Sequence, residues 1–126
     1  MRRVLVSIVA LSVFAGSPLA AEEIEIEIVV SPNVINIASA STVVTVHTEI
    51  AYSAVEGVSV KLNGLDIAWW KSDSRGYFVA KFMASAVKGI VKADTTATLT
   101  LLGETNDGGS FSGSDTVEVI DQKKGV

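Results

Sequence analysis

Residues 58–69 read VSVKLNGLDIAW, and this stretch decides the fold. Apolar and polar residues alternate on both sides of Asn63-Gly64, the kind of dipeptide that most readily forms a two-residue type I′ β-turn. The pattern predicts a hairpin between strands 57–62 and 65–71. Residues that face each other across a hairpin share one face of the sheet, so Trp70 is expected on the face opposite the core. The core face is expected to contain three cross-strand pairs: Leu62 with Leu65, Val60 with Ile67, and Val58 with Trp69.

Short apolar runs separated by turn residues continue this pattern along the rest of the chain. β-branched and aromatic residues are typical of strands, and Gly, Pro, Asn and Asp are typical of the turns between them. Residues 84–92 fit either a helical turn or a crossover loop. Seven or eight short antiparallel strands in about 100 residues predict an all-β fold, a sandwich of two sheets. The further expected strands are 24–30, 34–37, 43–50, 77–83, 95–102 and 111–120.

The period of two also predicts which side chains face the core, because successive residues of a strand point to opposite faces. The polar positions are expected to face water. The inward set is Val44, Val46, Phe78, Ala80, Phe82, Ala97, Leu99, Leu101, Val117 and Val119. The outward set is Thr45, His47, Glu49, Thr96, Thr98 and Thr100.

The start of the chain has the composition of a secretory signal peptide. Two arginines are followed by an apolar run at 4–14 and by a helix breaker with small residues at 16–21. The apolar run is too short to cross a bilayer, which takes about 20 residues. Cleavage is expected after Ala20 or Ala21, leaving a protein without a membrane span that is secreted, periplasmic or held at the cell surface. The expected division of the chain is 1–21 signal peptide, 22–121 sandwich domain and 122–126 polar tail.

Charge and cysteine content exclude several classes of protein. The chain has 10 basic and 14 acidic side chains, a formal charge of −4. Loss of Arg2 and Arg3 with the signal leaves 8 basic residues (10 − 2) and a charge of −6 (8 − 14). Such an acidic domain lacks the basic patch that nucleic acid or an anionic membrane surface requires. The chain has no cysteine, which excludes disulfides and thiolate chemistry and fits an exported prokaryotic protein better than an animal one.

Four turn motifs occur together in the mature sequence. They are Ser31-Pro32-Asn33, Leu62-Asn63-Gly64, Asp73-x-x-Gly76 and Leu101-Leu102-Gly103…Asp107-Gly108…Phe111-x-Gly113-x-Asp115. With them the chain resembles, over most of residues 22–121, the immunoglobulin-like β-sandwich modules of bacterial and archaeal secreted or cell-surface proteins. The resemblance implies a spacer, an adhesive unit or a binding platform, and fold likeness does not choose among these roles. The chain departs from antibody-type domains because it lacks their Cys…Trp…Cys core.

Signatures of an enzyme are absent from the sequence. His47 is the only histidine and is predicted on a polar strand face. The run Gly109–Gly113 fails the G-x-S-x-G nucleophile pattern because Phe111 stands where the serine is required. One histidine cannot build a multi-histidine zinc site. We therefore expect no catalytic activity and no cofactor.

Two groups of acidic and amide side chains are candidates for a cation site. Glu23, Glu25 and Glu27 lie about 6.8 Å apart along a strand, too far to share one ion unaided, so a charged face that discourages edge-to-edge aggregation is the better interpretation. The second group is found in loops, where Asp and Asn are above all turn formers. Its order fits no calcium-loop motif, and whether calcium binds there stays open. These residues are Asp73, Asn106, Asp107 and Asp115.

Trp70 is the strongest candidate for ligand contact, because an exposed indole can pack against a sugar ring or a partner's side chain. Tyr77 and Tyr52 are candidates to widen its surface. The sequence thus predicts an exported, non-catalytic structural or interaction module that is protein-binding or surface-associated. It is expected to engage another protein through a sheet edge or through the face that carries Trp70. The alternative is a small carbohydrate-binding module that uses Trp70. Coplanar aromatic residues beside an open Trp70 favour the carbohydrate, and a lone tryptophan in an apolar patch favours the protein.

Overall fold

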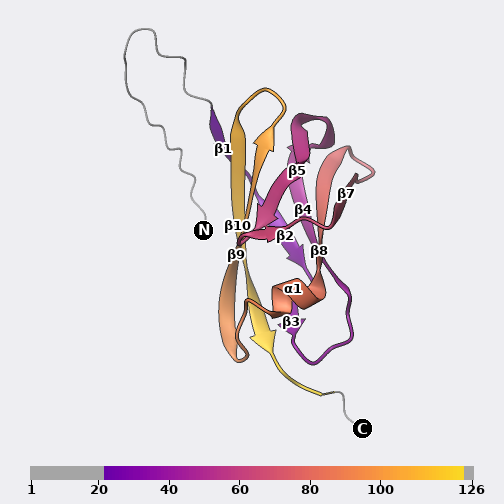
Figure 1. Ribbon diagram of the computed structural model, residues 1–126, viewed down its shortest axis with the longest axis vertical. Coiled ribbons are helices and arrows are strands. Elements are labelled where there is room, and N and C mark those ends of the chain that lie inside the picture. The colour runs from indigo at the N-terminus through magenta and orange to yellow at the C-terminus, as the bar shows by residue number, and fades with distance from the viewer. Residues whose placement is uncertain (1–21, 124–126) are drawn as a thin grey trace, which may run out of the picture.

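The structure, a computed structural model, describes residues 22–123 and shows two β-sheets packed face to face (Figure 1). The expected all-β, two-sheet sandwich is confirmed. One sheet has the order β1-β10-β9-β5-β6 with β3 also paired to β10, and the other has the order β2-β4-β8-β7. The expected signal peptide, 1–21, and the last three residues of the tail lie outside the described residues. The strands are β1 (Glu23–Glu25), β2 (Ile28–Ser31), β3 (Val34–Asn36), β4 (Val43–Ala51), β5 (Val55–Leu62), β6 (Leu65–Asp66), β7 (Trp69–Ser72), β8 (Tyr77–Met83), β9 (Thr95–Thr105) and β10 (Ser110–Ile120).

The chain changes sheets twice within its first fifteen described residues. β1 and β3 both run parallel to β10, at opposite ends of it, whereas β2, between them in sequence, pairs antiparallel with β4 in the other sheet. The single strand expected at 24–30 is therefore two strands. This splitting raises the number of strands above the seven or eight expected. The pairs that β1 and β3 form with β10 are parallel, so the expectation of antiparallel strands alone is wrong.

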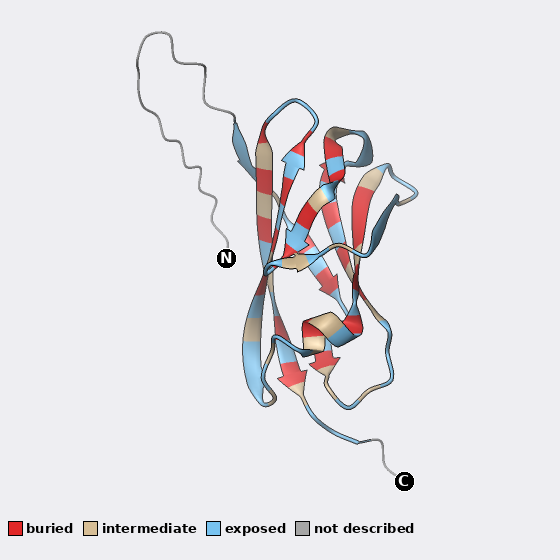
Figure 2. Ribbon diagram, viewed as in Figure 1, coloured by how far each residue is buried: buried red, intermediate tan, exposed pale blue. Residues whose placement is uncertain are grey.

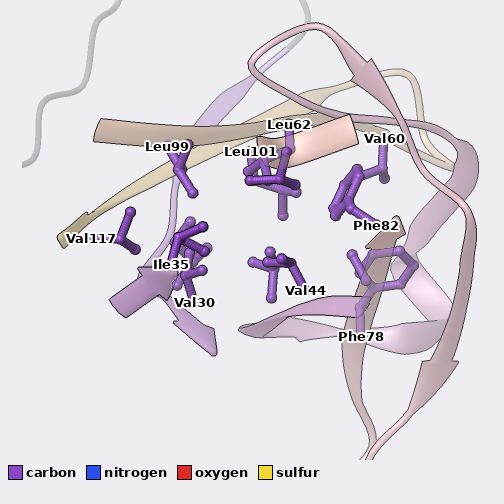
Figure 3. Packing of buried hydrophobic residues seen from close by; sticks show 14 of the residues in the cluster. Val30, Ile35, Val44, Val60, Leu62, Phe78, Phe82, Leu99, Leu101 and Val117 are labelled. Carbon is purple, nitrogen blue, oxygen red and sulfur yellow. The ribbon is translucent and has the colours of Figure 1, made fainter. Parts of the chain in front are cut away.

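Alternation of buried and exposed residues builds the interior (Figure 2). Every residue of the expected inward set is buried except Ala97, which is partly buried and packs against the core. Phe78, Phe82 and Val44 from one sheet face Val60, Leu62 and Leu101 from the other (Figure 3). Full burial of each such side chain contributes about 1.5–3 kcal/mol, and this apolar layer holds the two sheets together.

The hairpin turn forms as expected, but its return strand does not. Asn63 and Gly64 have positive φ values of 47° and 85°, as a type I′ turn requires, and Leu62 pairs with Leu65. The ladder then ends at Asp66. Beyond it the chain passes into the other sheet, where Trp69 pairs with Lys81 of β8. The expected pairings of Val60 with Ile67 and of Val58 with Trp69 are therefore wrong.

A bulge in β5 adds to this error. The β5–β9 register shifts between Glu56 and Lys61. There the Ser59 hydroxyl donates to the Glu56 carbonyl (2.7 Å) and accepts the N–H of Glu104 (2.8 Å) in place of a regular ladder bond. Between these positions β5 advances five residues (61 − 56) and β9 two (104 − 102). An odd number of extra residues in one strand changes which faces the side chains on either side of the bulge occupy. Val58, expected in the core, is consequently 71% exposed.

A short helix, α1 (Ala84–Lys88), closes one end of the core (Figure 1). Its Ala84 and Val87 are buried, and the Ala84 N–H donates to the Thr42 carbonyl (2.9 Å). Of the two alternatives for residues 84–92, a helical turn is the one that forms. Within residues 22–123 no helix is long and apolar enough to cross a membrane.

Candidate functional site

The two tryptophans lie on β7, an edge strand whose four residues are all exposed. Trp70 pairs with Ala80, which is fully buried, and Trp69 pairs with Lys81. Because paired residues share a face, Trp70 points toward the core side of the sheet and Trp69 points away from it. The expected orientation of the two residues is therefore reversed, for the reason given above: the chain changes sheets between β6 and β7.

The Trp70 side chain extends from β7 of one sheet to β5 of the other. A Cβ atom placed on Gly57 of β5 would stand 2.1 Å from Cε2 of the Trp70 indole, a distance at which two carbons cannot coexist. The indole thus packs directly against the glycine backbone of the opposite sheet, while 37% of Trp70 remains exposed. It serves as a closing side chain for this edge and as part of its surface. Trp69, 45% exposed, lies fully on the outer face.

Neither tyrosine joins Trp70. Tyr77 lies on the face of Trp69, but four residues from Lys81, the partner of Trp69, which places it about 14 Å away along the strand direction. The Arg75 guanidinium covers Tyr77 at 5.4 Å from the ring centroid. Tyr52 stacks on Phe78, with ring centroids 6.3 Å apart. The structure does not assemble Trp70, Tyr77 and Tyr52 into one aromatic platform.

The candidate calcium ligands do not converge on one site, and their side chains form hydrogen bonds with main-chain groups instead. Asp115 accepts the N–H of Val30 (2.9 Å), a hydrogen bond that links the two sheets. The Asn106 amide donates to the Ser53 carbonyl (2.8 Å). No group of three or more His, Cys, Asp or Glu in the described part of the chain is placed to hold a metal ion.

Asp73 organises the turn between β7 and β8, and Asp107 organises the turn between β9 and β10. Asp73 accepts the N–H groups of Tyr77 (3.0 Å) and Arg75 (2.8 Å), and these bonds, the Tyr77 bond first, lower the pKa of its carboxyl group. Asp107 accepts the Thr105 hydroxyl (2.6 Å), which is the main cause of its lowered pKa. Both carboxylates are therefore anionic at neutral pH.

A groove opens at the opposite edge of the sandwich, between β1 and the end of β4, with a volume of about 750 Å³. It arises because the β2–β4 ladder begins at the Ile28–Thr48 pair, so that residues 49–51 of β4 extend beyond Ile28, the first residue of β2. No pattern in the sequence predicts this groove, since it depends on the change of sheet after Glu25. Its lining consists of Glu22, Ile24, Ile26, Glu49, Ile50, Ala51, Ala54, Thr105, Asn106, Asp107 and Gly109.

His47 takes no part in any cluster. It is exposed on the outer face of the four-stranded sheet, as expected, between Val29 of β2 and Val79 of β8.

Comparisons of this chain with protein-family models, with curated proteins and with solved structures find no match.

Proposed function

We propose that this chain is an exported, non-catalytic interaction module of the immunoglobulin-like type, which binds a protein partner through the free edge of β7. The carrying observation is the pair of exposed tryptophans on this edge strand, which face opposite ways. Exposed strand edges recruit partner strands through main-chain hydrogen bonds, and tryptophans are enriched among the residues that dominate protein interfaces.

The hydrogen-bond pattern leaves main-chain groups of β7 directed outward. Asp73 donates its N–H to the Tyr77 carbonyl (2.9 Å). Bonded and non-bonded pairs alternate along an antiparallel ladder, so Lys71 directs its N–H toward β8, whereas Trp70 and Ser72 direct theirs to the free edge. A partner strand added here would bring one row of side chains to Trp69 and the other to Trp70.

The arrangement favours a protein over a carbohydrate. Trp69 and Trp70 lie on different faces, and neither is flanked by a coplanar aromatic residue.

A photo-crosslinking amino acid at position 71 tests the proposal in the cells that export the protein. We expect a discrete protein adduct at position 71 and none at position 98, which lies on the threonine-rich outer face of the other sheet. Ser72→Pro removes an outward N–H and should abolish the adduct, whereas Ser72→Ala retains this N–H and should preserve it. Equal labelling at 71 and 98, or an adduct that survives Ser72→Pro, contradicts binding at this edge. A saturable fluorescence change with polysaccharides that is lost in Trp69→Ala supports the carbohydrate alternative instead.

A further inference from the structure

The groove beside β1 is an open strand position. β1 ends the six-stranded sheet and is held to β10 by hydrogen bonds from Ile26 N–H to the Ser112 carbonyl (2.8 Å) and from Ser110 N–H to the Glu22 carbonyl (2.9 Å). Across the groove, residues 49–51 of β4 have no β2 neighbour. Among residues 22–123, no side chain fills the gap between the sheets at this point, whereas core side chains fill it elsewhere.

The floor of the groove is apolar and its volume suits a ligand. Ile24, Ile26 and Ile50 form most of the apolar lining, and Ile24 is 40% exposed. Sites that bind small ligands typically measure about 300–1,000 Å³, and the observed volume of about 750 Å³ falls within this range. Isoleucine is expensive to leave in water, because each buried methylene is worth about 0.8 kcal/mol, so the floor offers binding energy to an apolar ligand.

The wall of the groove is held in place without a ligand. The Asn106 N–H donates to the Ala54 carbonyl (2.9 Å), and the Asn106 side chain donates to the Ser53 carbonyl (2.8 Å). Gly109 allows β1 to approach, because a Cβ there would stand 2.8 Å from the Glu22 carbonyl oxygen. A wall fixed in advance lowers the entropy lost on binding.

The described part of the rim carries negative charge. Glu22, Glu49 and Asp107 line the groove, and none of its lining residues within 22–123 is basic. The chain continues this charge with Glu23 and Glu27, both exposed. An acidic rim around an apolar floor repels anionic ligands and attracts cationic ones.

We propose that this groove binds an extended segment of another protein in which aliphatic residues alternate with lysine or arginine. Alternation is required because side chains of an extended strand point to opposite sides, so that aliphatic groups face the isoleucine floor while cationic groups reach the carboxylates. The site is independent of β7, since it lies at the other edge of the sandwich, and its test does not depend on the outcome there.

Fluorescence anisotropy with a labelled octapeptide of alternating lysine and valine tests the proposal on the purified protein. We expect saturable binding that weakens as salt is raised, because the rim charges are screened. A block peptide of the same composition, with four lysines followed by four valines, should bind about tenfold more weakly, since it cannot place valines and lysines on opposite sides.

Two matched pairs of variants locate the binding. Ile24→Ser should weaken binding about tenfold, and Val29→Ser, an exposed aliphatic residue on the outer face of the four-stranded sheet, should leave it unchanged. Glu49→Gln should weaken binding and reduce its salt dependence, whereas Glu118→Gln, on the outer face of β10, should do neither.

Three results overturn the proposal: no binding of the alternating peptide, equal binding of the block peptide, or equal losses in Val29→Ser and Ile24→Ser. Sedimentation velocity supplies a further check, because a dimer of the wild-type protein that is lost in Ile24→Ser would make a second copy of this chain the occupant. Glu49→Gln keeps the test decisive if Ile24→Ser disturbs β1.

Discussion

The two edges of this sandwich differ in how the gap between the sheets ends. At the β7 edge, the gap between the sheets is closed by the Trp70 indole, which lies against the bare backbone of Gly57. At the β1 edge, the side chains along the gap are isoleucines and alanines, which do not close it, and a groove with an acidic rim remains. Closing the gap at a sandwich edge therefore requires a large side chain on one sheet and, on the other sheet, a residue small enough to leave room for it. An edge without this pair keeps an open groove between the sheets.

Among substitutions at the residues of the two edges, Trp70→Ala should have the largest effect. Removal of a fully buried aromatic side chain costs about 3–5 kcal/mol; since Trp70 is partly exposed, we expect a loss of about 2 kcal/mol in the free energy of unfolding, measured in urea. Trp69→Ala is the matched control and should cost less than about 1 kcal/mol, because Trp69 lies on the outer face. Equal losses in the two variants contradict a closing role for Trp70.

Gly57→Ala should rank second, with a loss of about 1–2 kcal/mol, because the added methyl group must displace the indole. In the Trp70→Ala background the same change should be nearly neutral, so that the double-mutant cycle gives a coupling energy of about 1 kcal/mol. The measurement is again urea unfolding. Additive losses would show that Gly57 and Trp70 act independently.

Ile24→Ser should have a smaller effect on stability, within about 1 kcal/mol, because Ile24 faces the open groove. Phe111→Ala, at the residue that pairs with Ile24 in β10, should cost about 3–5 kcal/mol. Thermal unfolding of both variants distinguishes the open edge from the core beside it. A loss in Ile24→Ser as large as that in Phe111→Ala would show that the groove is part of the packed interior.

The smallest effects concern pH. The pKa of Asp73 is lowered from its ordinary 3.8 in the folded protein, so its contribution to stability is present above that value and is lost as the pH falls through the lower folded pKa. Asp73→Asn should therefore reduce the difference between the melting temperatures at pH 7 and pH 2. Asp107→Asn should do the same, and should in addition weaken peptide binding at the groove, which Asp73→Asn should not affect. Melting curves identical to wild type at both pH values would contradict these roles.

Local sequence patterns predicted much of the fold. The period of two identified Phe78, Ala80 and Phe82 as core residues, because a strand's facing is set by its own alternation once its neighbours cover one side. Asn63-Gly64 predicted its turn, because few residues accept two consecutive positive φ values. Both are properties of short segments, and both are confirmed.

The candidate sites were harder to predict, because they depend on how strands are distributed between the sheets. Counting from the hairpin placed Trp69 inside and Trp70 outside, and the change of sheet between Asp66 and Trp69 reversed them. No residue pattern marks that change, since Ile67 and Ala68 also fit a continuous strand. The same holds for the groove, which exists because the chain leaves β10 after Glu25.

The sequence by itself determined the all-β class, the core-facing residues of most strands, the hairpin turn and the negative charge of the domain, because each follows from local alternation, local backbone preference or composition. Only the tertiary structure decided which tryptophan closes the sandwich, which one faces outward and where a groove is left open. These features depend on contacts between residues far apart in the chain, such as Gly57 with Trp70 and β1 with β10. Packing between the sheets sets them, and no single segment contains that information.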